Sequence, residues 1–401
     1  MKKYIALILV ILAGAYISSC DKEGAQLYDV EITVNYPDGY TADTKANIKV
    51  TVTNNLTSKL DSARTDADGK AAFRLEQGTY TIAAATATDE FAFNGILENK
   101  IVTEITRKFD ISLVAISLQG GLVFKEIYYT GSRTPEDKTY FADQFHEIYN
   151  NSDDTIYLDG LCIGVLETTA TNPSPWVDGE GNLLDRLPVG FHAWMWPGNG
   201  TTYPLAPRMS TVLAQDAIDH QTDPAGNPTS PVNLGNAQWE TYVEAPGKDT
   251  DNPAVPNLTL MYTTSATMFD WLHSVFGAAV IIFRLPTGLD YQSFVNNPDN
   301  FSTKPGTTST IQYFMVHKDW VIDAVEIVQA DPTKQNKRLH TTLDAGKVWS
   351  SGTYVSKSIR RKVDKIIDGK VIYKDTNNST EDFLSEQVPT PFIHPTTVDV
   401  K

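Results

Sequence analysis

Apolar and polar residues alternate in short runs through the first quarter of the chain. Single polar residues separate the apolar members of one run, which are Val30, Ile32, Val34 and Tyr36. This period of two is typical of a strand with one buried and one solvated face. Similar runs recur near residues 48–52, 71–75, 80–84 and 109–113, with turn-forming residues between them. The pattern predicts a small β-sandwich over residues 28–117.

Beyond Gly120-Gly121, further strands are predicted in longer apolar runs. The segment 276–286 is apolar enough for a central strand, and residues 320–326 alternate again. Before these two strands lies an insertion at about 165–257, where residues 173–231 hold nine of the 21 prolines. Proline removes backbone donors, so this stretch is neither a regular helix nor a central strand. We therefore predict an all-β chain whose second, larger β-sandwich covers residues 120–390 and carries long loop insertions.

The N-terminus has the composition of a secretory signal peptide. Two lysines precede the apolar run 4–15, and small residues lead to Cys20. A cysteine at the cleavage point resembles a bacterial lipobox, although Ile17 stands where leucine is usual. The resemblance implies a signal peptide at 1–19, a lipid on Cys20, a tether over 20–27 and an outer-membrane location at the cell surface. The alternative is an ordinary signal peptide with an incidental cysteine.

Charge and cysteine content narrow the function classes. The 401-residue chain has 49 acidic residues against 33 Lys plus Arg, and a formal net charge of -16. Nucleic acid is excluded as a partner, since phosphate binding requires a basic surface. Cys162 lies in an apolar run and is predicted to be a buried core residue. With Cys20 acylated, no intramolecular disulfide is expected.

Residues 65–82 read TDADGKAAFRLEQGTYTI. They resemble the carboxypeptidase regulatory-like, transthyretin-type sandwich family, in which the D-x-D-G segment forms a hairpin turn and G-x-Y begins the next strand. Asp66 and Asp68 also suggest a fragment of a calcium loop. The twelfth position of such a loop is Gln77 and not an acid, so the turn is the favoured interpretation.

The larger body resembles a lamin-tail-like domain, an immunoglobulin-type β-sandwich. The matching segments are a strand ending in EIYY at 126–129, EIYNN at 147–151, and DTNNSTEDF at 375–383. The whole layout is similar to a Bacteroidetes-type outer-membrane lipoprotein family of unknown function. That resemblance implies a non-catalytic surface protein that binds a ligand or partner, either an outer-membrane nutrient transporter or an extracellular polymer.

Two groups of residues are candidate binding sites in the insertion. Phe191 to Gly200 has the sequence FHAWMWPGNG, and its His192, Trp194 and Trp196 present rings suited to a flat ligand such as a sugar. The alternative is that these rings form a private core. Asp216, Asp219 and His220 offer oxygen and imidazole ligands for a divalent metal. The alternative is that they face water at a strand end.

Several catalytic motifs are absent from the sequence, including H-E-x-x-H, G-x-S-x-G, the P-loop and C-x-x-C. We therefore predict no catalytic residue and no cofactor. Two other functions stay open: a metal-dependent extracellular hydrolase of phosphodiesters or glycosides, and a structural or adhesive spacer. The basic segment 357–362 either grips an anion or pairs internally with acidic residues.

Overall fold

Strands make up almost all of the regular structure. The computed structural model describes residues 26–42, 44–88, 91–117, 121–167, 172–244, 247–265, 267–271 and 273–400. The helices are short: α1 (Tyr291–Val295), α2 (Ser379–Asp382) and the 3-10 turns η1 (Pro298–Asn300), η2 (Lys318–Trp320) and η3 (Pro332–Lys334). The predicted all-β fold class is confirmed. Within these ranges, no helix has the length and apolar character needed to span a membrane.

The N-terminal sandwich consists of two sheets. One has the order β4-β1-β7 and contains β1 (Leu27–Asn35), β4 (Lys70–Glu76) and β7 (Lys108–Ser112). The other has the order β3-β2-β5-β6-β8 and contains β2 (Lys49–Asn54), β3 (Leu60–Arg64), β5 (Gly78–Ala87), β6 (Phe91–Val102) and β8 (Val114–Ser117). The alternating apolar residues of both sheets meet in one core, which includes Ile32, Val50, Phe73, Ile82 and Ile111.

The Asp66 turn differs from the hairpin that the resemblance implies. The Asp66 carboxylate accepts the backbone N–H groups of Asp68 and Lys70, both at 2.9 Å, which fixes the turn. The turn nevertheless leads from one sheet to the other, because β3 pairs with β2 whereas β4 pairs with β1. It therefore connects the two layers of the sandwich.

The larger body is built from two further sheets. A six-stranded sheet has the order β18-β17-β12-β9-β24-β27, with β9 (Leu122–Tyr128), β12 (Phe145–Asn150), β17 (Ser210–Ala214), β18 (Trp239–Glu240), β24 (Ser358–Arg361) and β27 (Phe383–Gln387). A seven-stranded sheet has the order β21-β22-β15-β14-β20-β23, and β19 pairs with β15 off this path. Its strands are β14 (Leu161–Leu166), β15 (Arg186–Met195), β19 (Thr259–Thr263), β20 (Val280–Arg284), β21 (Phe301–Thr303), β22 (Gln312–His317) and β23 (Val321–Val325).

Three two-stranded ribbons complete the strands of the body. They are β10 (Ser132–Arg133) with β11 (Thr139–Tyr140), β13 (Ile156–Tyr157) with β16 (Pro204–Leu205), and β25 (Val363–Ile367) with β26 (Lys370–Tyr373). The last ribbon packs on the six-stranded sheet, because Val363, Val371 and Tyr373 share a buried cluster with Val123 and Tyr149.

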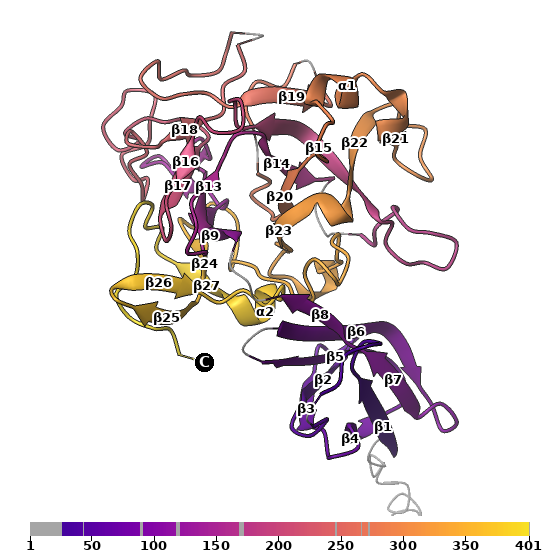
Figure 1. Cartoon of the computed structure of the whole chain (residues 1–401). Coiled ribbons are helices and arrows are strands. Elements are labelled where there is room, and N and C mark those ends of the chain that lie inside the picture. Colours follow the sequence, from indigo (N-terminus) through magenta and orange to yellow (C-terminus); the bar gives the residue numbers. More distant parts are fainter. Residues whose placement is uncertain are drawn as a thin grey trace, which may run out of the picture.

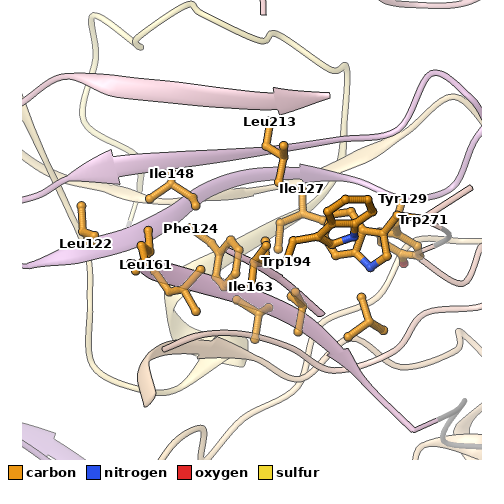
Figure 2. Close-up of a cluster of buried hydrophobic side chains, with 14 of the residues drawn as sticks. Leu122, Phe124, Ile127, Tyr129, Ile148, Leu161, Ile163, Trp194, Leu213 and Trp271 are labelled. Atoms are coloured by element: carbon orange, nitrogen blue, oxygen red, sulfur yellow. The ribbon is translucent and has the colours of Figure 1, made fainter. Parts of the chain in front are cut away.

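The main core of the body lies between its two large sheets. Figure 2 shows Phe124, Ile127 and Ile148 of the six-stranded sheet facing Leu161 and Ile163 of the other. The outer face of each large sheet is also covered by other segments. As a result, β9, β12 and β14 are buried along their whole length. The predicted core position of Cys162 is confirmed, since it is a free, fully buried cysteine on the outer face of the seven-stranded sheet.

The two parts of the chain touch near α2. In Figure 1 the N-terminal sandwich lies below the body, with β6 and β8 beside α2. Asn94 of β6 donates a hydrogen bond to the backbone carbonyl of Thr376 at 2.5 Å, and Lys49 of β2 forms an ion pair with Glu381 of α2 at 2.9 Å. These contacts place the starts of β2 and β6 at the body and leave their other ends distant from it.

Candidate functional site

The inserted segment covers the outer face of the six-stranded sheet. Tyr128, Phe145 and Val212 point outward from that sheet and are buried by loop residues of the insertion: Ala217, Val232, Leu234, Ala237 and Val255. The prediction that residues 173–231 contain no central strand is wrong, because β15, which includes Pro188, and β17 lie in this range and each pairs with strands on both sides. The loops that follow β17 pack as a second apolar layer on the sheet. The loops are therefore held in place by a core of their own.

The aromatic residues predicted as a ligand platform lie inside the protein. The side chains of His192, Trp194 and Trp196 are all 0% exposed. Trp194 and Trp196 belong to the core between the two large sheets, where Trp194 lies close to Ile127 and Trp271 (Figure 2). Their burial is what the alternative interpretation, a private core, expects.

The predicted metal ligands do not converge on one point. Asp219 accepts the backbone N–H of Gln221 with its carboxylate and so caps its own turn. The imidazole of His220 is fully buried between the Tyr140 hydroxyl, at 2.8 Å from Nδ1, and the backbone carbonyl of Asp216, at 3.1 Å from Nε2. Burial lowers the pKa of His220 to about 4, so the ring is neutral at physiological pH.

Asp216 instead joins two acidic residues that are distant in the sequence. It follows β17, whereas Asp249 lies between β18 and β19, and Asp270 lies between β19 and β20. Carboxylate oxygens of these three residues lie within 4.8 Å of one another. We call this group the carboxylate cluster. Asp216 is buried, and the other two are partly buried.

Burial and mutual repulsion raise the pKa values within the carboxylate cluster. The pKa of Asp216 rises to about 8, first through burial and then through the charges of Asp249, Asp270 and Glu240. The pKa of Asp249 rises to about 7 for the same kind of reason, with burial again the largest cause. Carboxylates in this state either share protons or gather around a cation.

No pattern in the sequence pointed to Asp249 or Asp270. They lie in different loops, and Asp249 is one of several acids in its segment. The parallel pairing of β17 with β18 and the hydrogen bond from the Val243 N–H to the Asp249 carboxylate help to bring Asp249 beside Asp216. Cys20, the predicted lipid attachment residue, lies outside the described residues.

The basic segment near the C-terminus pairs internally. Arg361 is 1% exposed, and its guanidinium contacts Asp323 at 2.6 Å, Asp375 at 2.9 Å and Asp382 at 3.7 Å. Its neighbour Arg360 forms an ion pair with Asp399 at 2.9 Å. These arginines therefore hold the body together, which favours the internal-pairing interpretation of the basic segment.

The fold defines the class of this protein. It is an all-β protein with an N-terminal sandwich and a larger, loop-covered β-sandwich body that holds the carboxylate cluster. The chain belongs to the DUF4876 family, described as a protein of unknown function. The family model matches residues 206–390, a range that includes the carboxylate cluster. The chain is similar to the crystal structure of a DUF4876 family protein from Bacteroides thetaiotaomicron VPI-5482, at 30% identity and a TM-score of 0.62. That match covers 92% of this chain and 98% of the other.

A second solved structure, the Streptococcal ancillary pilin, matches 50% of this chain and 61% of its own at 11% identity. Its TM-score of 0.18 is too low to indicate a shared fold. No curated protein matches the chain.

Proposed function

We propose that this protein is a lipid-anchored surface protein that acts by binding and not by catalysis. In this proposal Cys20 carries the lipid, the N-terminal sandwich faces the outer membrane, and the larger body binds a partner. The partner is an outer-membrane nutrient transporter or an extracellular polymer. The N-terminal part is a carboxypeptidase regulatory-like sandwich, and the body is an expanded lamin-tail-like domain.

One observation supports the proposal that the N-terminal sandwich faces the membrane. Within the described residues, five of the six exposed large hydrophobic side chains of the N-terminal sandwich gather at one end. They are Leu27 (44% exposed), Leu56 (92%), Leu60 (63%), Ile101 (59%) and Ile105 (92%). We call this end the apolar tip. Solvent-exposed apolar groups on this scale mark surfaces that contact a membrane or another protein.

The strand pairing places the members of the apolar tip together. The turn after β2 contacts the end of β6, because the Asn55 side chain donates a hydrogen bond to the Asn99 side chain at 3.0 Å. The start of β1 lies beside the loop before β7, where Asp29 and Ile105 line one shallow hollow. The sixth exposed residue, Val114, lies on β8 and pairs with Asn94 at the body end.

The anchor and the apolar tip lie close together along the chain. Cys20 and Leu27 can be at most about 25 Å apart even in a fully extended chain. A lipid on Cys20 would therefore keep the apolar tip near the bilayer. Burying one leucine or isoleucine side chain contributes about 1.5–3 kcal/mol, so several would add a second membrane signal to the lipid.

Vesicle flotation of the mature, full-length chain tests this proposal. Intact mass should first show the mass of the lipid on Cys20. We then expect the double variant Leu56→Glu, Ile105→Glu to float with vesicles several-fold less than the wild type. A matched control, Phe276→Glu with Val388→Glu, changes body residues that are 54% and 63% exposed. An unmodified Cys20, or equal flotation of the two double variants, would contradict the proposal.

A further inference from the structure

We propose that the carboxylate cluster of Asp216, Asp249 and Asp270 binds a calcium ion. This site differs from the predicted one, because it replaces Asp219 and His220 with two acids from other loops. It also goes beyond the proposed function, since it is independent of the lipid and of the membrane. The argument rests on geometry, on unpartnered buried side chains and on charge.

The spacing of the oxygens fits a calcium ion. Calcium binds oxygen ligands at about 2.3–2.6 Å, so two ligands on opposite sides of the ion lie about 4.8 Å apart. The three carboxylates offer oxygens that all lie within 4.8 Å of one another. An ion between them can therefore reach all three without a large movement of the backbone.

Buried polar atoms at the carboxylate cluster lack partners. Asp216 is 7% exposed, and its Oδ1 has no hydrogen-bond partner among the described residues. The preceding residue, Gln215, is 3% exposed, and its side-chain amide oxygen also has no hydrogen-bond partner among the described residues. The Gln215 amide nevertheless lies close enough to act on the Asp270 carboxylate. Unpartnered buried polar groups are costly, and a cation at this point would supply the missing interaction.

The charged groups around the carboxylate cluster favour the binding of a cation. The charged groups that act most strongly on Asp216 are Asp249, Asp270 and Glu240, and all three are acidic. The nearby Lys248 places its ammonium group over the ring of Phe269, 5.7 Å from the ring centroid. A divalent ion would turn the repulsion among the three carboxylates into attraction.

The ligand types favour calcium over other metals. The carboxylate cluster offers only oxygen, with the amide oxygen of Gln215 as a fourth possible ligand. The nitrogen ligand predicted from the sequence, His220, is engaged by Tyr140 and by the Asp216 backbone. Oxygen-only sites suit calcium and magnesium, and calcium tolerates irregular geometry better than magnesium. The ion would cross-link three loops at one edge of the body.

Calorimetric titration of the full-length chain in detergent, after removal of metals with EDTA, tests the site. We expect calcium to bind with a dissociation constant of about 0.1–1 mM, the range of extracellular calcium-binding modules. The variants Asp216→Asn and Asp270→Asn should each bind at least tenfold more weakly. Asp219→Asn is the matched control, because its carboxylate caps a turn outside the carboxylate cluster.

Thermal unfolding separates loss of the site from loss of the fold. Calcium should raise the melting temperature of the wild type and of Asp219→Asn but not that of Asp216→Asn. Without metal, Asp216→Asn should melt no lower than the wild type, because the neutral amide replaces a buried carboxyl group whose charged form its acidic neighbours oppose. The proposal is overturned if millimolar calcium leaves the wild type unchanged, if Asp216→Asn binds as tightly as Asp219→Asn, or if magnesium binds as tightly as calcium.

Discussion

The N-terminal sandwich and the larger body differ in how many faces of their sheets are buried. Strands of the N-terminal sandwich keep one solvated face, as in β4, where buried and exposed residues alternate along the whole strand. In the body, β9 has no exposed residue. Among the described residues of the N-terminal sandwich, Thr65 and Asn94 are the only buried polar ones, whereas the body buries many charged groups.

This difference follows from the insertion and the C-terminal segments. Where loops cover the second face of a sheet, its polar residues lose water and need partners inside the protein. Lys125 of β9 and Glu147 of β12 illustrate this, because both side chains are 0% exposed and form an ion pair at 2.7 Å. The core of the N-terminal sandwich is therefore almost entirely apolar, whereas the loop-covered body also contains buried, paired charges.

The largest expected effect concerns the shared core of the body. Trp194→Ala combined with Trp196→Ala should remove about 3–5 kcal/mol for each ring, which is comparable to the whole stability of a domain. We expect the body to unfold while the N-terminal sandwich stays folded, since its core is separate. Limited proteolysis with mass spectrometry would then leave a resistant fragment that covers residues 28–117. A double variant that stays folded would contradict the core position of these rings.

A buried arginine should matter far more than an exposed one. Burial opposes the charge of Arg361, but the surrounding carboxylates outweigh it and raise its pKa above the usual value. Arg361→Leu would leave these carboxylates unpaired and should cost about 3–5 kcal/mol in unfolding free energy. Arg74→Leu in the N-terminal sandwich is the control, because its ion pair with Asp29 is exposed and worth under about 1 kcal/mol. Similar losses in urea unfolding would remove the contrast between the two regions.

The pH dependence of stability should trace partly to a buried histidine. Burial lowers the pKa of His192 to about 4. The unfolded chain therefore takes up a proton near pH 6.5 that the folded chain takes up only near pH 4, and stability falls as the pH drops through this window, by up to about 3 kcal/mol. His192→Phe removes this loss. Urea unfolding at about pH 7 and about pH 4.5 should show a smaller decrease for the variant than for the wild type; equal decreases would disprove the assignment.

The smallest expected effect lies at the junction of the two regions. The ion pair of Lys49 with Glu381 is partly exposed, so Lys49→Met should change the free energy of unfolding by under about 1 kcal/mol. Calorimetric unfolding would measure it. A loss of several kcal/mol would mean that the two regions unfold as one unit, contrary to the comparison drawn above.

Strand periodicity predicted β1, β2, β4, β5 and β7 of the N-terminal sandwich, because buried residues alternate with more exposed ones along them. It gave no signal for β3, β6 or β8, and in β3 and β6 that alternation is absent or broken. It also predicted strands around Leu122 and Val280 in the body. Periodicity could not predict how the insertion folds over the six-stranded sheet, since its prolines give no regular pattern. The carboxylate cluster was equally beyond reach, because Asp216, Asp249 and Asp270 are distant in the sequence and meet only in the fold. Trp194 shows why the sequence left two interpretations of the aromatic residues open. An aromatic motif has the same sequence whether its rings line a surface or fill a core.

The proposed division between a membrane-facing sandwich and an outward-facing body is tested most directly by hydrogen exchange of the lipidated chain on vesicles. The account predicts slower exchange at the apolar tip, around residues 27, 55–60 and 99–106, with the body unchanged relative to the detergent-solubilised chain. Slower exchange in the loops over the six-stranded sheet, with the apolar tip unchanged, would contradict it.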